Sequence, residues 1–65
     1  MLGDDLRWFT TLAELERVGE AAERLQMAQP TLSRMLARLE WRLGQRLFDR
    51  HGKRISLNDR GRVFY

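Results

Sequence analysis

The side chains best equipped for chemistry in this 65-residue chain are its arginines. Eleven of the twelve basic residues are Arg, and the planar guanidinium donates paired hydrogen bonds to a phosphate or to the edge of a guanine. The chain has no Cys and a single His, which excludes thiolate zinc sites and disfavours a histidine metal site. We therefore expect no cofactor and no metal in this chain, and the arginines suggest nucleic acid as its partner.

The net charge of +3 is divided unevenly along the chain. Residues 1–33 hold three basic and six acidic side chains, a net charge of −3, whereas residues 34–65 hold nine basic and three acidic ones, a net charge of +6. Charge alone is explained equally well by a solvated surface. The positions of the basic residues must decide between the two interpretations.

Four polar residues follow one another closely near position 30: Gln29, Thr31, Ser33 and Arg34. A Gln side chain can pair with adenine through two hydrogen bonds, and a Thr methyl can meet a thymine methyl. Arg34 can reach a guanine or a phosphate. The alternative interpretation is that these are ordinary residues of a helix surface.

A long amphipathic helix positions these residues. It is predicted from about Gln29 to just before Gly44, with Pro30 in its first turn, where the missing N–H is not needed. Its N-cap is Ala28 or Gln29, and neither is a strong cap. Arg34 and Arg38 point away from a stripe of core residues. The stripe comprises Leu32, Leu36, Leu39 and Leu43.

Two shorter helices are predicted before it. The first runs from about residue 5 to residue 15, and Asp4 or Asp5 serves as its cap. Its apolar positions are Leu6, Phe9 and Ala13. The second runs from about Gly19 to Gln26 behind a poor capping region, with an apolar stripe formed by Ala21, Ala22 and Leu25.

A small basic hairpin is predicted after Gly44. The segments 47–50 and 53–57 flank a two-residue link, His51-Gly52, in which Gly accepts a positive φ. Asn58 then caps a last helix that begins at Asp59 and is cut short at the end of the chain. The cations near the hairpin tip suit phosphates or the minor groove, although they could equally protect an edge strand from aggregation. These are Arg50, His51, Lys53 and Arg54.

Residues 21–43 have the layout of a helix-turn-helix, with the turn at residues 26–28. In this motif the second helix presents its first residues to base edges in the major groove, while the first helix crosses the backbone. The spacing by itself is only moderately specific, because many helical bundles contain such a pair.

The amino-acid sequence resembles that of a known family. The matching residues are Ala21-Ala22 with Leu25, Gln29-Pro30 with Ser33, Leu39-Glu40 with Leu43-Gly44, Leu47-Phe48 with Arg50, and Leu57 with Gly61. Leu6, Phe9 and Ala13-Glu14 also fit the first helix. Together they are similar to the amino-terminal domain of LysR-type bacterial transcriptional regulators, a resemblance that covers nearly the whole chain.

The resemblance implies one mainly α domain over residues 1–65. Its fold is a winged helix-turn-helix, with a three-helix core, a two-stranded β-hairpin wing and the start of a fourth, linker helix near residue 58. The implied function is sequence-specific binding of double-stranded DNA in transcription regulation. The residues expected at the DNA are Gln29, Pro30, Thr31, Ser33, Arg34, Arg38, Arg50, Lys53 and Arg54.

Other parts of such a regulator are expected outside this chain. The family uses its linker helix to form a homodimer or a higher homo-oligomer, and a separate domain to sense a small-molecule effector. We expect the linker helix to be truncated here and the effector domain to be absent. No stretch of the chain approaches the about 20 apolar residues of a membrane span, and we expect a cytoplasmic, nucleoid-associated location without membrane contact.

Four residues or pairs depart from the family pattern. Glu16-Arg17 replaces a usual Gly-Ser and Ala28 replaces a usual Ser, each at a cost of about 1 kcal/mol in helix capping. Glu20 would repel a DNA phosphate unless it turns aside. Asn58 replaces a usual Thr as the cap of the last helix.

Parts of the sequence are compatible with two other functions. A winged-helix protein-interaction module without DNA binding is suggested by Glu20, Ala28 and the acidic first half of the chain. A hydrolase would need Ser33, His51 and Asp49 as a triad, but no oxyanion site is visible beside them. We therefore expect no catalytic residues.

The two tryptophans fit the pattern less clearly. Trp41 falls opposite the leucine stripe, so it is expected to be partly exposed, either as a surface residue shielded by Arg stems or as a dimer contact.

Overall fold

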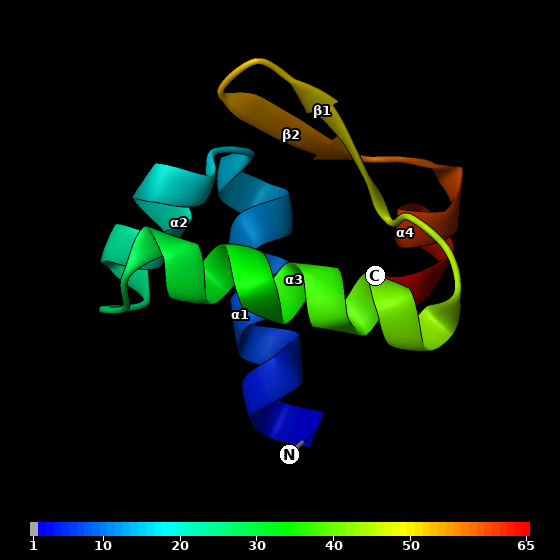
Figure 1. The fold of residues 1–65 in the computed structure, drawn as a ribbon, viewed down its shortest axis with the longest axis horizontal. Helices are drawn as coiled ribbons and strands as arrows, with labels where there is room; N and C mark the ends of the chain where they lie inside the picture. Colours follow the sequence, from blue (N-terminus) through cyan, green and yellow to red (C-terminus); the bar gives the residue numbers. More distant parts are fainter. Residues whose placement is uncertain (1) are drawn as a thin grey trace.

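A computed structural model describes the backbone of residues 2–65 and the side chains of residues 7–65. The elements in chain order are α1 (Leu2–Leu15), α2 (Val18–Arg24), α3 (Gln29–Leu43), β1 (Phe48–His51), β2 (Arg54–Leu57) and α4 (Asp59–Phe64). In Figure 1, α3 crosses in front of α1, the hairpin β1–β2 lies above α3, and α4 lies behind the carboxyl-terminal end of α3. The predicted winged helix-turn-helix fold is confirmed. Across the described residues, no helix is long and apolar enough to cross a membrane.

The core is built around Phe9 of α1. Its ring meets Phe48 of β1 at 5.4 Å and Phe64 of α4 at 5.1 Å between centroids, both edge to face, a favoured geometry for aromatic pairs. Trp8, which the sequence left unplaced, is buried next to it, with 3% of its surface exposed. One aromatic residue therefore joins the first helix to the wing and to the last helix.

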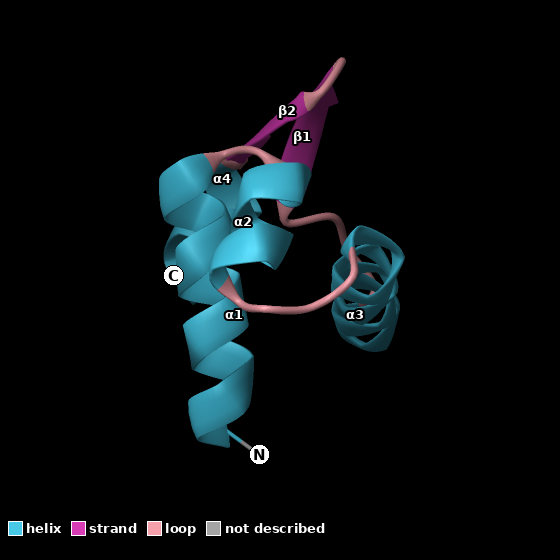
Figure 2. Ribbon diagram, turned by 90° about the vertical axis from the view of Figure 1, so that its left-hand side faces the viewer, coloured by secondary structure: helices cyan, strands magenta, loops and turns pink. Residues whose placement is uncertain are grey.

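The leucine stripe of α3 is core over only part of its length. Leu32 and Leu36 are buried and Leu39 is half-buried, but Leu43 is 40% exposed. Figure 2 shows α3 at one side of the molecule, seen end-on, with α1 and α2 on the other side. The prediction that Leu43 is a core residue was wrong, because the last turn of α3 extends past the helices that cover the earlier turns.

Left-handed residues end the first three helices, and only one of them is glycine. Glu16 follows α1 at φ 59°, Gln26 follows α2 at φ 58°, and Gly44 follows α3 at φ 72°. After α2, the amide of Met27 donates to the carbonyl of Ala22 at 3.0 Å, the longer bond of a Schellman cap. Helix α2 therefore ends at Arg24, two residues before the predicted Gln26.

Two predicted helix starts also differ from the structure. Helix α1 begins at Leu2, three residues earlier than predicted, so Asp4 and Asp5 lie within the helix and not before it. The side chains of Asp4, Asp5 and Leu6 lie outside the described ones. Helix α2 begins at Val18, one residue earlier than predicted, and Arg17 occupies its N-cap without a side-chain cap. Ala28 holds the N-cap of α3, likewise without a side-chain hydrogen bond, as expected from the sequence.

The hairpin turns one residue later than predicted. Its register pairs Phe48 with Leu57 and His51 with Arg54, so the two-residue link is Gly52-Lys53 and not His51-Gly52. Gly52 has φ 65°, which any side chain would disfavour. His51 therefore belongs to the strand β1.

The carboxylate of Glu40 joins α3 to the wing. Its Oε2 accepts hydrogen bonds from the backbone N–H groups of Leu47 at 2.8 Å and of Phe48 at 3.3 Å. Both of these residues have buried side chains. A charged acceptor on buried amides is stronger than a neutral one, so Glu40 fixes where the strand β1 begins.

Asn58 caps α4, as predicted, and its side chain also binds the segment before the wing. Its Oδ1 accepts from the N–H of Gly61 at 2.8 Å, while its Nδ2 donates to the carbonyl of Arg46 at 3.0 Å. Its own N–H donates to the carbonyl of Leu47 at 3.0 Å. At Gly61, an added Cβ would lie 2.1 Å from that same carbonyl oxygen, so α4 packs directly on the backbone of Leu47.

Replacing Glu40 by Ala is expected to lower the free energy of unfolding by about 2 kcal/mol, because two amides near the core lose their acceptor. Urea unfolding followed by circular dichroism measures the change. The Glu40→Gln variant is the matched control, since its amide oxygen can still accept and the loss should be smaller. Equal losses in both variants, or a loss under about 0.5 kcal/mol in the alanine variant, would contradict this role.

Candidate nucleic-acid interface

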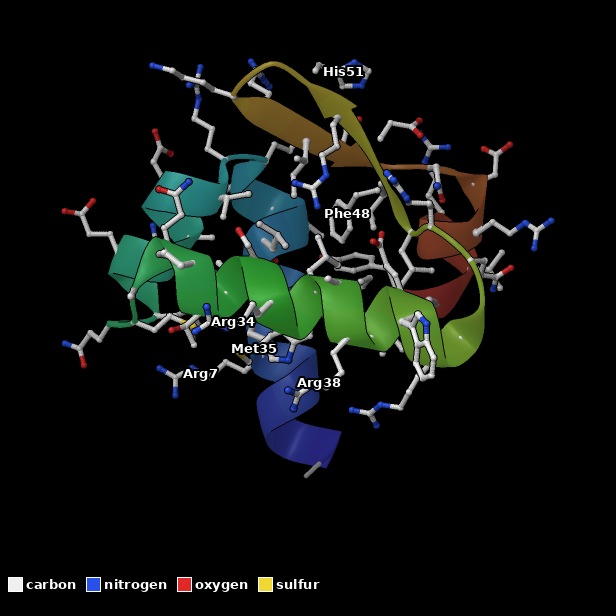
Figure 3. The ribbon with its side chains drawn as sticks, in the orientation of Figure 1. Arg7, Arg34, Met35, Arg38, Phe48 and His51 are labelled. Atoms are coloured by element: carbon white, nitrogen blue, oxygen red, sulfur yellow. The ribbon has the colours of Figure 1, made fainter. Side chains whose placement is uncertain are left out.

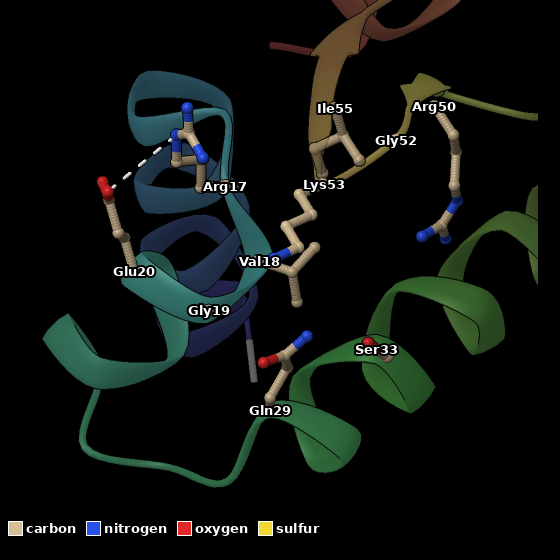
Figure 4. Close-up of a pocket in the computed structure, with 10 residues that line it drawn as sticks. All are labelled: Arg17, Val18, Gly19, Glu20, Gln29, Ser33, Arg50, Gly52, Lys53 and Ile55. Carbon is tan, nitrogen blue, oxygen red and sulfur yellow. Dashed lines mark ion pairs between the residues drawn. The ribbon is translucent and has the colours of Figure 1, made fainter.

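A hollow of about 480 Å³ lies between the start of α2, the first turns of α3 and the wing. Figure 4 shows Gln29 and Ser33 on α3 facing Lys53 and Arg50 of the wing across it. Four of the nine residues predicted to meet DNA therefore line one concave surface. The full lining is Arg17, Val18, Gly19, Glu20, Gln29, Ser33, Arg50, Gly52, Lys53 and Ile55.

The other predicted residues of α3 lie outside the hollow. Pro30, Arg34 and Arg38 are exposed, and Thr31 is half-buried. In Figure 3, Arg34 and Arg38 lie on the side of α3 away from the wing. The exposed surface of α3 thus has polar, wing-facing residues on one side and two guanidinium groups on the other.

The side chain of Arg54 is bonded to another residue of the chain. Its Nη2 forms an ion pair with Oε1 of Glu16 at 2.9 Å. The backbone of Arg54 also forms an isolated antiparallel β-bridge with the backbone of Arg17. The backbone N–H of Ile55 donates to the carbonyl of Glu16 at 3.0 Å. The wing is therefore tied to the segment between α1 and α2 by Glu16, through both its side chain and its backbone.

Glu20 lies at the edge of the hollow and is turned toward Arg17. Its Oε2 is 3.9 Å from Nε of Arg17, and Figure 4 shows the carboxylate directed away from Gln29 and Ser33. Both side chains of this pair are well exposed, so the attraction is weak. It nevertheless turns the Glu20 carboxylate aside. The sequence predicts that Glu20 repels a DNA phosphate unless its side chain turns in this way.

Sequence reasoning did not assign Arg17 to this surface. It was counted with the acidic half of the chain and noted only as a poor helix cap, yet it lines the hollow opposite α3. Its position directly before α2, the helix that crosses the DNA backbone in this motif, was the available signal.

The residues of the hydrolase hypothesis are not assembled. The hydroxyl near Nε2 of His51 is that of Ser56, at 3.4 Å, two residues along β2 from Arg54, the residue paired with His51, and not that of Ser33. No group of three or more His, Cys, Asp or Glu side chains suited to a metal ion occurs in the part of the chain that the structure describes.

Comparison with known proteins identifies the family of this chain. Residues 4–62 match the model of the bacterial regulatory helix-turn-helix protein, lysR family. The chain belongs to this LysR family. Its members found here are transcriptional regulators and not enzymes.

Curated LysR relatives and solved structures agree with each other. The chain is 51% identical over 61 residues to YybE, an uncharacterized HTH-type transcriptional regulator of Bacillus subtilis, covering 94% of the chain and 21% of that protein. It is 48% identical over 60 residues to the transcriptional regulator BsdA of the same organism, covering 91% of the chain and 21% of that protein. The chain therefore spans about one fifth of the length of these LysR relatives.

Several of the similar solved structures are DNA complexes, and two of them serve as examples. The crystal structure of a CbnR_DBD-DNA complex superposes with a TM-score of 0.87 at 34% identity, covering 94% of this chain and 70% of that one. The BenM_DBD/benA site 1 DNA complex superposes with a TM-score of 0.87 at 35% identity, covering 95% and 72%. The fold of this LysR domain is thus the fold found in DNA-bound members.

Glu16 occupies a left-handed conformation that favours glycine, the residue usual in the LysR pattern. Replacing Glu16 by Gly relieves a backbone cost of about 1 kcal/mol but removes the exposed ion pair with Arg54, worth at most about 1 kcal/mol. Replacing it by Gln removes the ion pair and keeps the strain. We expect Glu16→Gly to be more stable than Glu16→Gln by about 0.5–1 kcal/mol, as measured by urea unfolding. The opposite order would show that the left-handed residue is not strained.

Proposed function

We propose that this chain binds double-stranded DNA in a sequence-specific manner, as the DNA-binding domain of a bacterial LysR-type transcriptional regulator. Helix α3 would lie in the major groove, and the wing around residues 50–54 would contact phosphates or the minor groove. The observation that carries the proposal is the meeting of the exposed first turns of α3 with a basic wing around one hollow, in a fold that matches DNA-bound relatives.

The first turns of α3 would read the bases. Gln29 and Ser33 are placed at the hollow with hydrogen-bonding groups available for base edges or phosphates. Pro30 and Thr31 offer apolar contact, in particular to thymine methyl groups. Arg34 and Arg38 are exposed on the other side of α3, where a guanidinium would reach a guanine or a phosphate of the opposite groove wall.

The wing would supply contacts that position the protein without reading sequence. Arg50 and Lys53 are exposed across the hollow from α3, and basic side chains neutralise phosphates by releasing condensed counterions. Arg54 would have to exchange its bond to Glu16 for one to DNA. Phosphate contacts of this kind fix register, and base contacts then discriminate between sequences.

The intact regulator would do more than this chain. In it we expect a homodimer or higher homo-oligomer, formed through a linker helix that begins with α4. A small-molecule effector would act through a domain outside this chain, and the protein would reside in the cytoplasm with the nucleoid. Two linked DNA-binding domains would bind more tightly than one, because the second contact forms at high effective concentration.

An amide chemical-shift titration of the 65-residue chain with a short A·T-containing duplex tests the proposal. Shifts that cluster at residues 29–38 and 50–54 and weaken with added salt are the expected result. Spectra that stay unchanged at low salt would contradict DNA binding by this chain, and would favour the alternative of a protein-interaction module.

The Arg34→Ala variant is expected to lose about 1–3 kcal/mol of binding free energy on its preferred duplex, with relaxed discrimination at one base pair, if Arg34 pairs with a guanine. If Arg34 contacts a phosphate, all duplexes weaken alike. Fluorescence anisotropy of labelled duplexes measures both. Arg62→Ala makes the same charge change on α4, where Arg62 pairs with Asp59, and serves as the control. Unchanged affinity in Arg34→Ala would remove this residue from the interface.

Glu16 is expected to weaken DNA binding by occupying Arg54. The Glu16→Gln variant leaves only a neutral amide acceptor for the guanidinium and removes a negative charge beside the wing, so Arg54 is released more easily and affinity should rise. The dependence of log affinity on log salt should steepen by about one counterion. The same anisotropy titration, repeated at several salt concentrations, measures both effects. Adding Arg54→Ala to this variant should cancel the gain, and a gain that persists would assign it to another residue.

A further inference from the structure

Trp41 is an exposed tryptophan on the outward face of α3. Its side chain is 83% exposed, while Trp8 is buried. At 100° per residue, Trp41 lies opposite the core positions Leu32 and Leu36, on the same stripe as Pro30 and Arg34. Trp41 therefore continues, toward the end of α3, the surface whose beginning is proposed to enter the major groove.

A second pocket, of about 500 Å³, lies beside Trp41 where α3 joins the wing. Its basic residues are Arg46 and Arg50, its other polar residues are Glu40 and Gln45, and its apolar walls include Ala37 and Trp41. Neither Arg46 nor Arg50 has an ion-pair partner among the side chains of residues 7–65. The carboxylate of Glu40, also in the lining, is engaged by the N–H groups of Leu47 and Phe48. The pocket thus combines two guanidinium groups that have no ion-pair partner among the described side chains with a carboxylate that already accepts two hydrogen bonds.

Groove dimensions connect this pocket to DNA. Trp41 lies eight residues beyond Ser33, which places it about 12 Å further along the helix axis. The major groove is about 12 Å wide. When the first turns of α3 contact base edges, the end of the helix therefore reaches the groove wall, where the sugars and phosphates lie.

We propose that this pocket seats a phosphate of the DNA backbone between Arg46 and Arg50, with the Trp41 indole packed on the adjoining deoxyribose. The inference rests on the proposed function and extends the DNA interface to the carboxyl-terminal end of α3. Charge favours DNA over a second copy of the chain. A two-fold contact sets the same patch against itself, which would bring the unpaired Arg46 and Arg50 side chains close to their own copies.

Tryptophan fluorescence tests the contact directly in the unaltered chain. Acrylamide should quench Trp41 and spare the buried Trp8, and saturating A·T-containing duplex should lower the quenching of Trp41 several-fold. The Trp41→Phe variant, which retains only Trp8, provides the background signal. Amide shifts at residues 29–34 are recorded in the same samples, so that DNA occupancy is known independently.

Variants measure what the contact contributes. Trp41→Ala should reduce affinity about tenfold for every duplex sequence, corresponding to the apolar area it covers. Arg46→Gln should lower the salt slope by about one counterion. Arg42→Gln is the matched control: it removes the same charge from the same end of α3, but Arg42 lies by Trp8, Met35 and Leu39, away from this pocket. It should leave affinity and slope nearly unchanged.

Three outcomes would overturn the inference. If residues 29–34 shift with DNA while Trp41 stays fully quenchable, the pocket is outside the interface and the proposed function stands. If no residue responds to DNA at low salt, both fail. If Trp41 becomes protected as protein concentration rises without DNA, and ultracentrifugation shows association, the surface binds a second copy instead.

Discussion

The bonds around the backbone of Leu47 hold the parts of this domain in their relative positions. Its N–H donates to the carboxylate of Glu40 on α3, its carbonyl accepts from Asn58 at the start of α4, and its side chain is fully buried. The next residue, Phe48, begins the wing and packs on Phe9 of α1. Contacts of Leu47 and Phe48 thus join every element except α2. The hollow between α3 and the wing depends on these contacts.

Much of the fold follows from the sequence because its strongest signals are local. The leucine spacing and Pro30 locate α3, Gly44 ends it, and Asn58 starts α4, each through a preference that acts within a few residues of the chain. The less accurate predictions have two physical causes. Gln26, which follows the C-cap of α2, takes a left-handed conformation without being glycine. The hairpin register is set by the burial of Phe48 and Ile55, which no turn residue reveals.

For the candidate interface, the sequence predicts which residues take part better than it predicts the bonds between them. Residue types and the family pattern singled out Gln29, Ser33, Arg50 and Lys53, and these do line one hollow. The role of Glu16 could not be seen, because its contact with Arg54 joins residues 38 positions apart. The same holds for Glu40, whose partners are backbone amides across the turn after α3. Long-range pairing of this kind depends on the tertiary structure, which local preferences do not encode.

The direct packing of α4 on the Leu47 backbone has a mechanical consequence. With a glycine at the contact, and with Asn58 donating two hydrogen bonds and accepting one around it, no flexible side chain separates α4 from the segment that anchors α3. A torque applied to α4 would therefore be transmitted to α3 and the wing together, with little slack between them. The domain would respond to such a force as a single lever, turning its whole DNA-facing surface at once.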